Sequence, residues 1–178
     1  MRIIAGTAKG TTLKAPSKGT RPVTGRARES LFSIIADRLP EADVLDLFAG
    51  SGSLGLEALS RGAATAVFVE RDRSAAAVVR FNIASVRLGG SVITAAVAVA
   101  VPRLRTEFDI VFVDPPYGDD DSTVDSVVRS LDGVVADGGL VVVHRQGSTG
   151  FTVPDFLTSV DQRHYGDAVI TLMERIDS

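Results

Sequence analysis

The stretch FDIVFVDPPYG, residues 108–118, is the part of the chain from which we predict the fold. It starts as a short apolar run rich in Val and Ile, which is the pattern of a strand buried on both faces of a parallel sheet. The run stops at Asp114, and Pro115 and Pro116 follow. Neither proline has a backbone N–H, and each restricts the residue before it, so the turn is stiff and its carbonyl groups can accept hydrogen bonds.

The groups in this turn would suit a planar ligand that carries an amino group. Asp114 supplies a carboxylate and Pro115 a fixed carbonyl. Tyr117 adds a flat ring with a polar tip, and Gly118 lets the chain leave in any direction. An ordinary tight turn uses the same residue types, because Asp and Pro are common in turns. From these residues alone, both interpretations remain open.

The rest of the chain alternates predicted strands and helices. Apolar runs predict strands over residues 44–48, 66–69, 92–95, 108–113 and 140–143, and a terminal hairpin over 159–165 and 168–175. Apolar spacing of three and four predicts helices over about 14 residues from Gly25, and over 54–60, 73–88 and 121–135. Residues 96–101 fit either a strand or a short helix. The alternation predicts an α/β fold with a doubly wound, mostly parallel, seven-stranded sheet, whose ligand lies beyond the carboxyl ends of the strands.

Length and composition limit the class of protein. The 178 residues suit one domain, and 45% of them are hydrophobic, as in globular proteins. The absence of cysteine excludes disulfides and Cys-based zinc sites, and with only two histidines we expect no metal. No apolar run approaches the roughly 18 residues that span a bilayer, and the first residues lack a signal-peptide core. We therefore expect a cytoplasmic protein that does not contact membranes.

The charge is unevenly distributed. The chain carries −3 overall, yet residues 1–38 hold eight basic and two acidic side chains, a balance of +6. Such a segment is typical of polyanion binding, although a solvated basic surface gives the same pattern. Thr24 is a plausible N-cap for the helix that starts near Gly25, and Arg26 and Arg28 in its first turn oppose the helix dipole, a conflict that a phosphate ligand would relieve.

A glycine-rich loop follows the strand at 44–48. Gly50, Gly52 and Gly55 form the pattern G-x-G-x-x-G, and Glu70 lies 20 residues beyond Gly50, which matches the fingerprint of dinucleotide-binding enzymes. Asp46, however, lies inside the strand, where a buried carboxylate needs a partner such as a ligand ammonium. A dinucleotide loop also gives no reason for the Asp-Pro-Pro-Tyr turn. The carboxylates of Asp46 and Glu70 would suit a ligand that has an amino acid at one end and a nucleoside at the other. S-adenosylmethionine is such a ligand, so these residues favour it.

Longer segments resemble a known family. DLFAGSGSLGLEALSRGA at 46–63, FVERDR at 68–73 and FDIVFVDPPYG at 108–118 are similar to class I S-adenosylmethionine-dependent methyltransferases. RIIAGTAKGTTLKAP at 2–16 and RPVTGRARESLF at 21–32 resemble the RsmD-type family, which methylates the exocyclic N2 of a guanine in small-subunit (16S) ribosomal RNA. The resemblance covers nearly the whole chain and implies a Rossmann-like methyltransferase sheet.

The resemblance also implies site residues and a division of the chain. Residues 1–24 would form a basic hairpin and loop that contacts RNA, with Lys9 at its tip, and residues 25–178 the methyltransferase domain. The catalytic residues would be Asp114, Pro115, Pro116 and Tyr117. The cofactor-binding residues would be Asp46, Phe48, Gly50, Ser51, Gly52, Gly55, Glu70, Arg71 and Ala96. The RNA-binding residues would be Arg2, Lys9, Arg21, Thr24, Arg26 and Arg28.

The chain departs from the family pattern in two places. Residues 94–97 lack the acidic residue that relatives often place against adenine, so backbone groups and apolar contacts near Ala96 would hold the adenine. His144 and Arg145 stand where an acidic residue is expected. We interpret His144 and His164 as ordinary histidines without a catalytic role.

The expected partner is small-subunit ribosomal RNA or an assembling small subunit, and we favour a monomer. Three other functions remain as alternatives. A DNA adenine-N6 methyltransferase would share the loop and the turn but generally needs a further target-reading region. A protein glutamine methyltransferase more often has Asn in place of Asp114. A non-catalytic RNA-binding module would not need Asp46, Glu70 and Asp114 to be intact.

Overall fold

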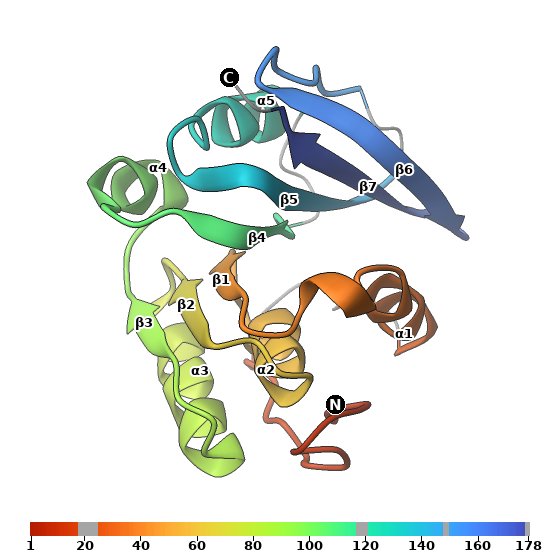
Figure 1. The fold of residues 1–178 in the computed structure, drawn as a ribbon. Coiled ribbons are helices and arrows are strands. Elements are labelled where there is room, and N and C mark those ends of the chain that lie inside the picture. Colours follow the sequence, from red (N-terminus) through yellow and green to blue (C-terminus); the bar gives the residue numbers. More distant parts are fainter. Residues whose placement is uncertain (18–24, 117–120, 148–149, 177–178) are drawn as a thin grey trace.

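A computed structural model describes residues 1–17, 25–116, 121–147 and 150–176. Its seven strands form one sheet in the order β3-β2-β1-β4-β5-β7-β6 (Figure 1). The first five pair in parallel, and β7 is antiparallel to both β5 and β6. The strands are β1 (Asp43–Leu47), β2 (Thr65–Val69), β3 (Ser91–Ile93), β4 (Phe108–Val113), β5 (Val135–Gln146), β6 (Leu157–Tyr165) and β7 (Ala168–Arg175). The prediction of a doubly wound, mostly parallel sheet of seven strands is confirmed.

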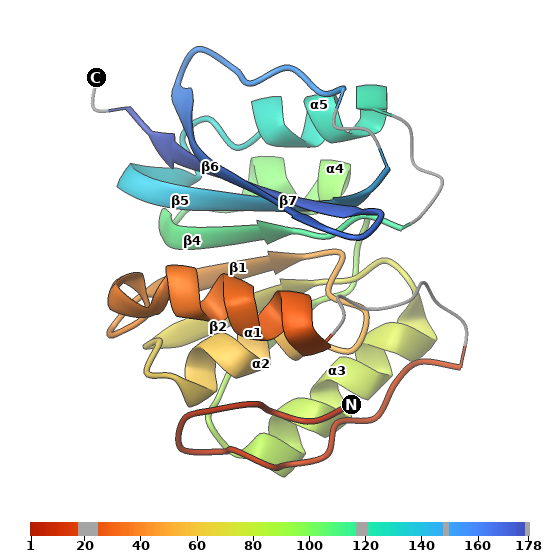
Figure 2. The ribbon, with the colours of Figure 1, turned by 90° about the vertical axis from the view of Figure 1, so that its right-hand side faces the viewer.

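Helices cover both faces of this sheet (Figures 1 and 2). One apolar cluster joins α1, α2 and α3 to one face, and a second joins α4 and α5 to the other. From Ile110 to Val113, successive residues of β4 alternate between the two clusters, which explains why this part of the strand is apolar, whereas Asp109 is exposed. The helices are α1 (Gly25–Ile34), α2 (Ser53–Ser60), α3 (Arg73–Val86), α4 (Val97–Ala100) and α5 (Asp121–Arg129), with short 3-10 turns at Ala36–Arg38 and Val101–Arg103. Among the described residues, no helix is long and apolar enough to cross a membrane.

The strand register brings four strand ends to one edge of the sheet. Leu47 of β1 lies beside Val69 of β2 and Val113 of β4, and Val113 lies beside Val143 of β5. The residues that follow these positions therefore meet at the carboxyl edge, where ligands of open parallel sheets bind.

Several predicted boundaries differ from the structure, and one segment that the sequence left open is now assigned. The helix expected to reach residue 135 ends at Arg129, because the chain turns through Gly133 at φ +76° and Val135 already begins β5. The ambiguous residues 96–101 form α4 and the start of a 3-10 turn rather than a strand. The first helix has 10 residues rather than about 14, and its Ile34, expected on the apolar face, is 39% exposed.

The N-terminal segment, residues 1–17, is packed against the body of the protein. Instead of a full hairpin it has one isolated antiparallel bridge, between Arg2 and Thr12. Ile3 and Leu13 belong to the same apolar cluster as α1 and α2. The fully buried carboxylate of Glu57 on α2 accepts hydrogen bonds from the backbone N–H groups of residues 4 and 5, at 2.7 and 3.0 Å. The segment is thereby fixed on α2.

Candidate functional site

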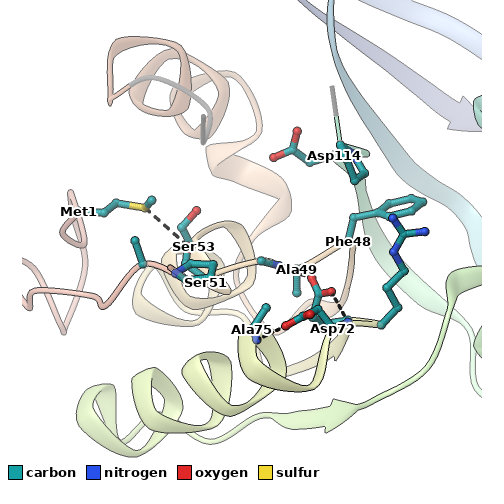
Figure 3. A pocket seen from close by; sticks show the side chains of 14 residues that line it. Met1, Phe48, Ala49, Ser51, Ser53, Asp72, Ala75 and Asp114 are labelled. Carbon is teal, nitrogen blue, oxygen red and sulfur yellow. Dashed lines mark hydrogen bonds between the residues drawn. The ribbon is translucent and has the colours of Figure 1, made fainter. Parts of the chain in front are cut away.

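A cavity of about 370 Å³ opens at the carboxyl edge of the sheet (Figure 3). The loop after β1, the turn after β2, the turn after β4 and the N-terminal segment all contribute to its wall. Its lining residues are Met1, Ala15, Pro16, Phe48, Ala49, Gly50, Ser51, Ser53, Glu70, Arg71, Asp72, Ala75, Asp114 and Pro116. The three sequence regions that predicted a ligand site thus meet at one cavity.

The loop between β1 and α2 has an unusual backbone. Phe48, Gly50 and Gly52 have positive φ angles of 59°, 56° and 75°. Glycine adopts such angles without strain, whereas for Phe48 they cost about 1–3 kcal/mol, a cost that is typical of functional sites. One carboxylate oxygen of Glu70 accepts the Gly50 N–H at 2.9 Å, and the other accepts the Asp72 N–H at 2.8 Å. Glu70 therefore fixes the loop against the turn after β2.

Asp46 and Gly55 lie behind the cavity and do not line it. Asp46 is 1% exposed, and its Oδ2 accepts the Gly55 N–H at 2.9 Å. A Cβ atom at residue 55 would approach Phe68 Cε1 to 2.4 Å, so Gly55 allows α2 to pack closely on the sheet. A ligand ammonium was the expected partner of Asp46, but the structure supplies Gly55 instead. Burial, with Asp114 and Glu70 nearby, raises the pKa of Asp46 to about 8.

Asp114 has a partner that the sequence did not predict. Its Oδ1 lies 2.6 Å from Nδ1 of His144, whose side chain is 4% exposed, while that of Asp114 is 25% exposed. The two residues follow Val113 and Val143, which are paired in the sheet. His144 was interpreted as an ordinary histidine, and only the register of β4 and β5 could have indicated the contact. One carboxylate oxygen of Asp114 is thus held by His144, and the other can accept a hydrogen bond from a ligand.

The remaining predicted site residues divide into two groups. Phe48, Gly50, Ser51, Glu70, Arg71, Asp114 and Pro116 line the cavity, whereas Asp46, Gly52, Gly55, Ala96 and Pro115 do not. Ala96 is exposed beyond the end of β3, and Pro115 is buried in the turn after β4. Tyr117 lies outside the described residues.

Sequence reasoning missed the N-terminal part of the cavity wall. Met1, Ala15 and Pro16 line the cavity, and the Ser51 hydroxyl donates to the sulfur of Met1 at 3.8 Å. The segment had been assigned to RNA contact alone, and its small and apolar residues carry no pattern that indicates a cavity.

The predicted RNA-binding residues also need one correction. Arg2, Lys9 and Arg26 are exposed. Arg28 is 3% exposed and donates to the carbonyl of Arg2 at 2.6 Å, and burial lowers its pKa. The prediction that Arg28 contacts RNA is therefore wrong, because its side chain is buried, donates to the N-terminal segment and interacts with the Glu57 carboxylate of α2. Arg21 and Thr24 lie outside the described residues.

The charges around the cavity favour a cationic ligand. Among the described lining residues, three side chains are carboxylates, Glu70, Asp72 and Asp114, and one is a cation, Arg71. A pyrophosphate would be repelled by this set, whereas a sulfonium or ammonium group would be attracted. The arrangement thus fits S-adenosylmethionine, which carries both cations, better than a nicotinamide dinucleotide.

Known proteins resemble this chain over nearly its full length. The family model described as conserved hypothetical protein 95 matches residues 1–174. Ribosomal RNA small subunit methyltransferase D of Escherichia coli strain K12 is 40% identical over 159 residues, which is 86% of this chain and 79% of that protein. The protein of the same name from Haemophilus influenzae is 37% identical over 123 residues, 66% of this chain and 64% of that protein.

A solved structure agrees with these sequence matches. The protein yhhF from Escherichia coli superimposes with a TM-score of 0.89 at 35% identity, covering 99% of this chain and 98% of the other. The cavity at the carboxyl edge and the acidic turn after β4 are consistent with the family match over residues 1–174. The chain therefore belongs to the conserved hypothetical protein 95 family, which the comparisons show to be a family of methyltransferases.

Proposed function

We propose that this protein transfers a methyl group from S-adenosylmethionine to the exocyclic N2 amine of a guanine in small-subunit ribosomal RNA. The observation that carries the proposal is the position of Asp114. Its carboxylate borders the same cavity as the glycine loop and Glu70, and His144 holds one of its oxygens. The family match and the names of the relatives support ribosomal RNA as the substrate class.

S-adenosylmethionine supplies an electrophilic methyl group on a sulfonium, which departs as a neutral thioether when the new N–C bond forms. The residues that would hold it line the cavity: Phe48, Gly50, Ser51, Glu70 and Arg71. In this proposal Glu70 accepts hydrogen bonds from the ribose hydroxyls, and the carboxylates nearby complement the positive charge.

Asp114 and Pro115 act on the guanine. The N2 amine is a poor nucleophile because its lone pair is delocalised into the ring. Hydrogen bonds from the amine to Oδ2 of Asp114 and to the Pro115 carbonyl turn the lone pair towards the methyl group and stabilise the positive charge that develops on nitrogen. After transfer, the amine loses one proton to Asp114 or to water.

The base must leave its stack to reach the cavity. In the proposal Tyr117 stacks on the extruded guanine, a contact worth about 1–3 kcal/mol. Arg2, Lys9 and Arg26 contact RNA phosphates, and all three are exposed. We further propose that the protein acts as a monomer in the cytoplasm, on free ribosomal RNA or on an assembling subunit.

A substrate panel tests the proposal. The purified protein is given methyl-labelled S-adenosylmethionine with small-subunit ribosomal RNA, assembled small subunits, duplex DNA or a peptide release factor, and the labelled product is identified. We expect N2-methylguanosine from the ribosomal substrates only. Label in adenine of the DNA, or in glutamine of the release factor, would show that the proposed substrate is wrong. If none of the four substrates is labelled, the proposed methyl-transfer activity is rejected.

A further inference from the structure

We infer that ribosomal RNA docks along an exposed basic face of α3 and reaches the cavity from there. We call this surface the α3 basic face, and it consists of Lys14, Arg73, Arg80, Phe81 and Arg87. The inference rests on the proposed function, because it names the surface that holds the proposed substrate.

The charge distribution singles out this part of the chain. Residues 73–106 contain five arginines and no Asp or Glu, a charge of +5. Since residues 1–38 carry +6 and the whole chain −3, all remaining residues together carry −14. A surface of one sign next to a body of the opposite sign orients a polyanion before contact.

The arginines of α3 are arranged along its length. Arg73 and Arg80 are seven residues apart, so they lie on the same side of the helix, about 10 Å apart along its axis. Arg87 follows at the C-terminal end, and all three side chains are exposed. The Arg80 guanidinium donates to the Thr94 hydroxyl at 2.7 Å, which holds it towards the carboxyl edge of the sheet. The spacing presents a row of cations to successive phosphates.

The N-terminal segment continues this surface, as it runs beside α3 (Figure 2). The buried Asn82 accepts the Lys14 N–H and donates to the Lys14 carbonyl, both at 2.9 Å. Lys14 Nζ lies 3.5 Å from the centre of the Phe81 ring, which is nevertheless 47% exposed. An exposed aromatic ring among cations is the combination that binds single-stranded RNA through stacking and phosphate contacts.

The α3 basic face ends at the cavity. Ala75, in the first turn of α3, and Ala15, next to Lys14, both line the cavity. RNA held on this face can therefore present a base to Asp114. Residues 107–178, which include α5 and β5 to β7, contain 14 acidic and four basic side chains and would repel RNA.

The test compares two variants with the same change in net charge. Arg80→Glu with Arg87→Glu alters the α3 basic face, and Arg129→Glu with Arg163→Glu alters exposed arginines on α5 and β6. Binding of full-length protein to a transcript of small-subunit ribosomal RNA is measured over a series of salt concentrations, without methyl transfer. We expect the α3 variant to bind about tenfold more weakly and its log–log salt slope to fall by about 1.5, while the control stays within about twofold of the wild-type protein.

Two outcomes would overturn the inference: equal losses in both variants, which indicate a general charge effect, or an unchanged salt slope in the α3 variant. Tighter binding to duplex DNA than to the transcript would also overturn ribosomal RNA as the partner. A separate methyl-transfer assay keeps the two proposals distinct. If the wild-type protein binds RNA through α3 but transfers no methyl group, the docking surface stands and the proposed function fails.

Discussion

Replacing His144 with Phe would remove one hydrogen bond from Asp114 while keeping a flat ring in the buried position. His144 Nδ1 is 2.6 Å from Asp114 Oδ1, so the bond fixes the direction of the carboxylate. Hydrogen bonds to charged groups contribute about 1.5–3 kcal/mol. Because Asp114 is 25% exposed, water can partly replace the lost donor, which favours the lower end of this range. Since about 1.4 kcal/mol corresponds to a factor of ten in rate, we expect kcat to fall about tenfold.

The assay measures methyl transfer to small-subunit ribosomal RNA under saturating substrates, together with the affinity for S-adenosylmethionine and the unfolding midpoint. We expect kcat to fall while cofactor affinity and stability stay near those of the wild-type protein. His144→Asn is the matched control, because its amide nitrogen can occupy the place of Nδ1 and should restore most of the rate. A His144→Phe variant with wild-type kcat would refute the positioning role. A loss of kcat in step with cofactor affinity and stability would reduce His144 to a structural residue.

Two further predictions concern buried carboxylates. The folded protein raises the pKa of Asp46 from 3.8 to about 8, so it holds this proton more tightly than the unfolded chain, and wild-type stability should fall as pH rises from about 4 to about 8. The Asp46→Asn variant has no titrating group at this position, so its stability relative to the wild-type protein should increase with pH by up to about 1.4 kcal/mol per pH unit. Urea unfolding of both proteins between pH 5 and 8 measures this. A stability difference that does not change with pH would contradict the raised pKa of Asp46. Glu57→Ala removes the carboxylate that accepts two backbone N–H groups and that interacts with the guanidinium groups of Arg28 and Arg61. We expect the free energy of unfolding to fall by about 3–5 kcal/mol. Wild-type stability in this variant would show that Glu57 does not hold the N-terminal segment.

The central strands β1 and β4 could be predicted because side chains on both of their faces are buried, whereas most residues of β6 are exposed. In β4 every residue from Ile110 to Val113 is inaccessible to solvent or nearly so, and such a position accepts only apolar side chains. The end of α5 could not be predicted in the same way. Val134 and Val135 continue the apolar spacing of the helix, but they pack on the sheet as the chain enters β5, and Gly133 makes the turn.

The site was predicted where a local pattern determines it and missed where distant residues meet. The positive φ angles of Gly50 and Gly52 follow from the loop sequence itself. The environments of Arg28 and His144 depend on Arg2 and Asp114, which are 26 and 30 residues away in the chain. A basic side chain in the first turn of a helix indicates phosphate binding only if it is exposed, and burial of Arg28 depends on the N-terminal segment that covers it.

The methyl-transfer activity of Asp114→Ala tests the proposed role of Asp114 most directly. The protein and this variant are incubated with labelled S-adenosylmethionine and small-subunit ribosomal RNA, N2-methylguanosine is quantified, and cofactor binding is measured on the same samples. We predict N2-methylguanosine with the wild-type protein and none with Asp114→Ala, while the variant still binds S-adenosylmethionine. Formation of N2-methylguanosine by Asp114→Ala at the wild-type rate would contradict the proposed role of Asp114.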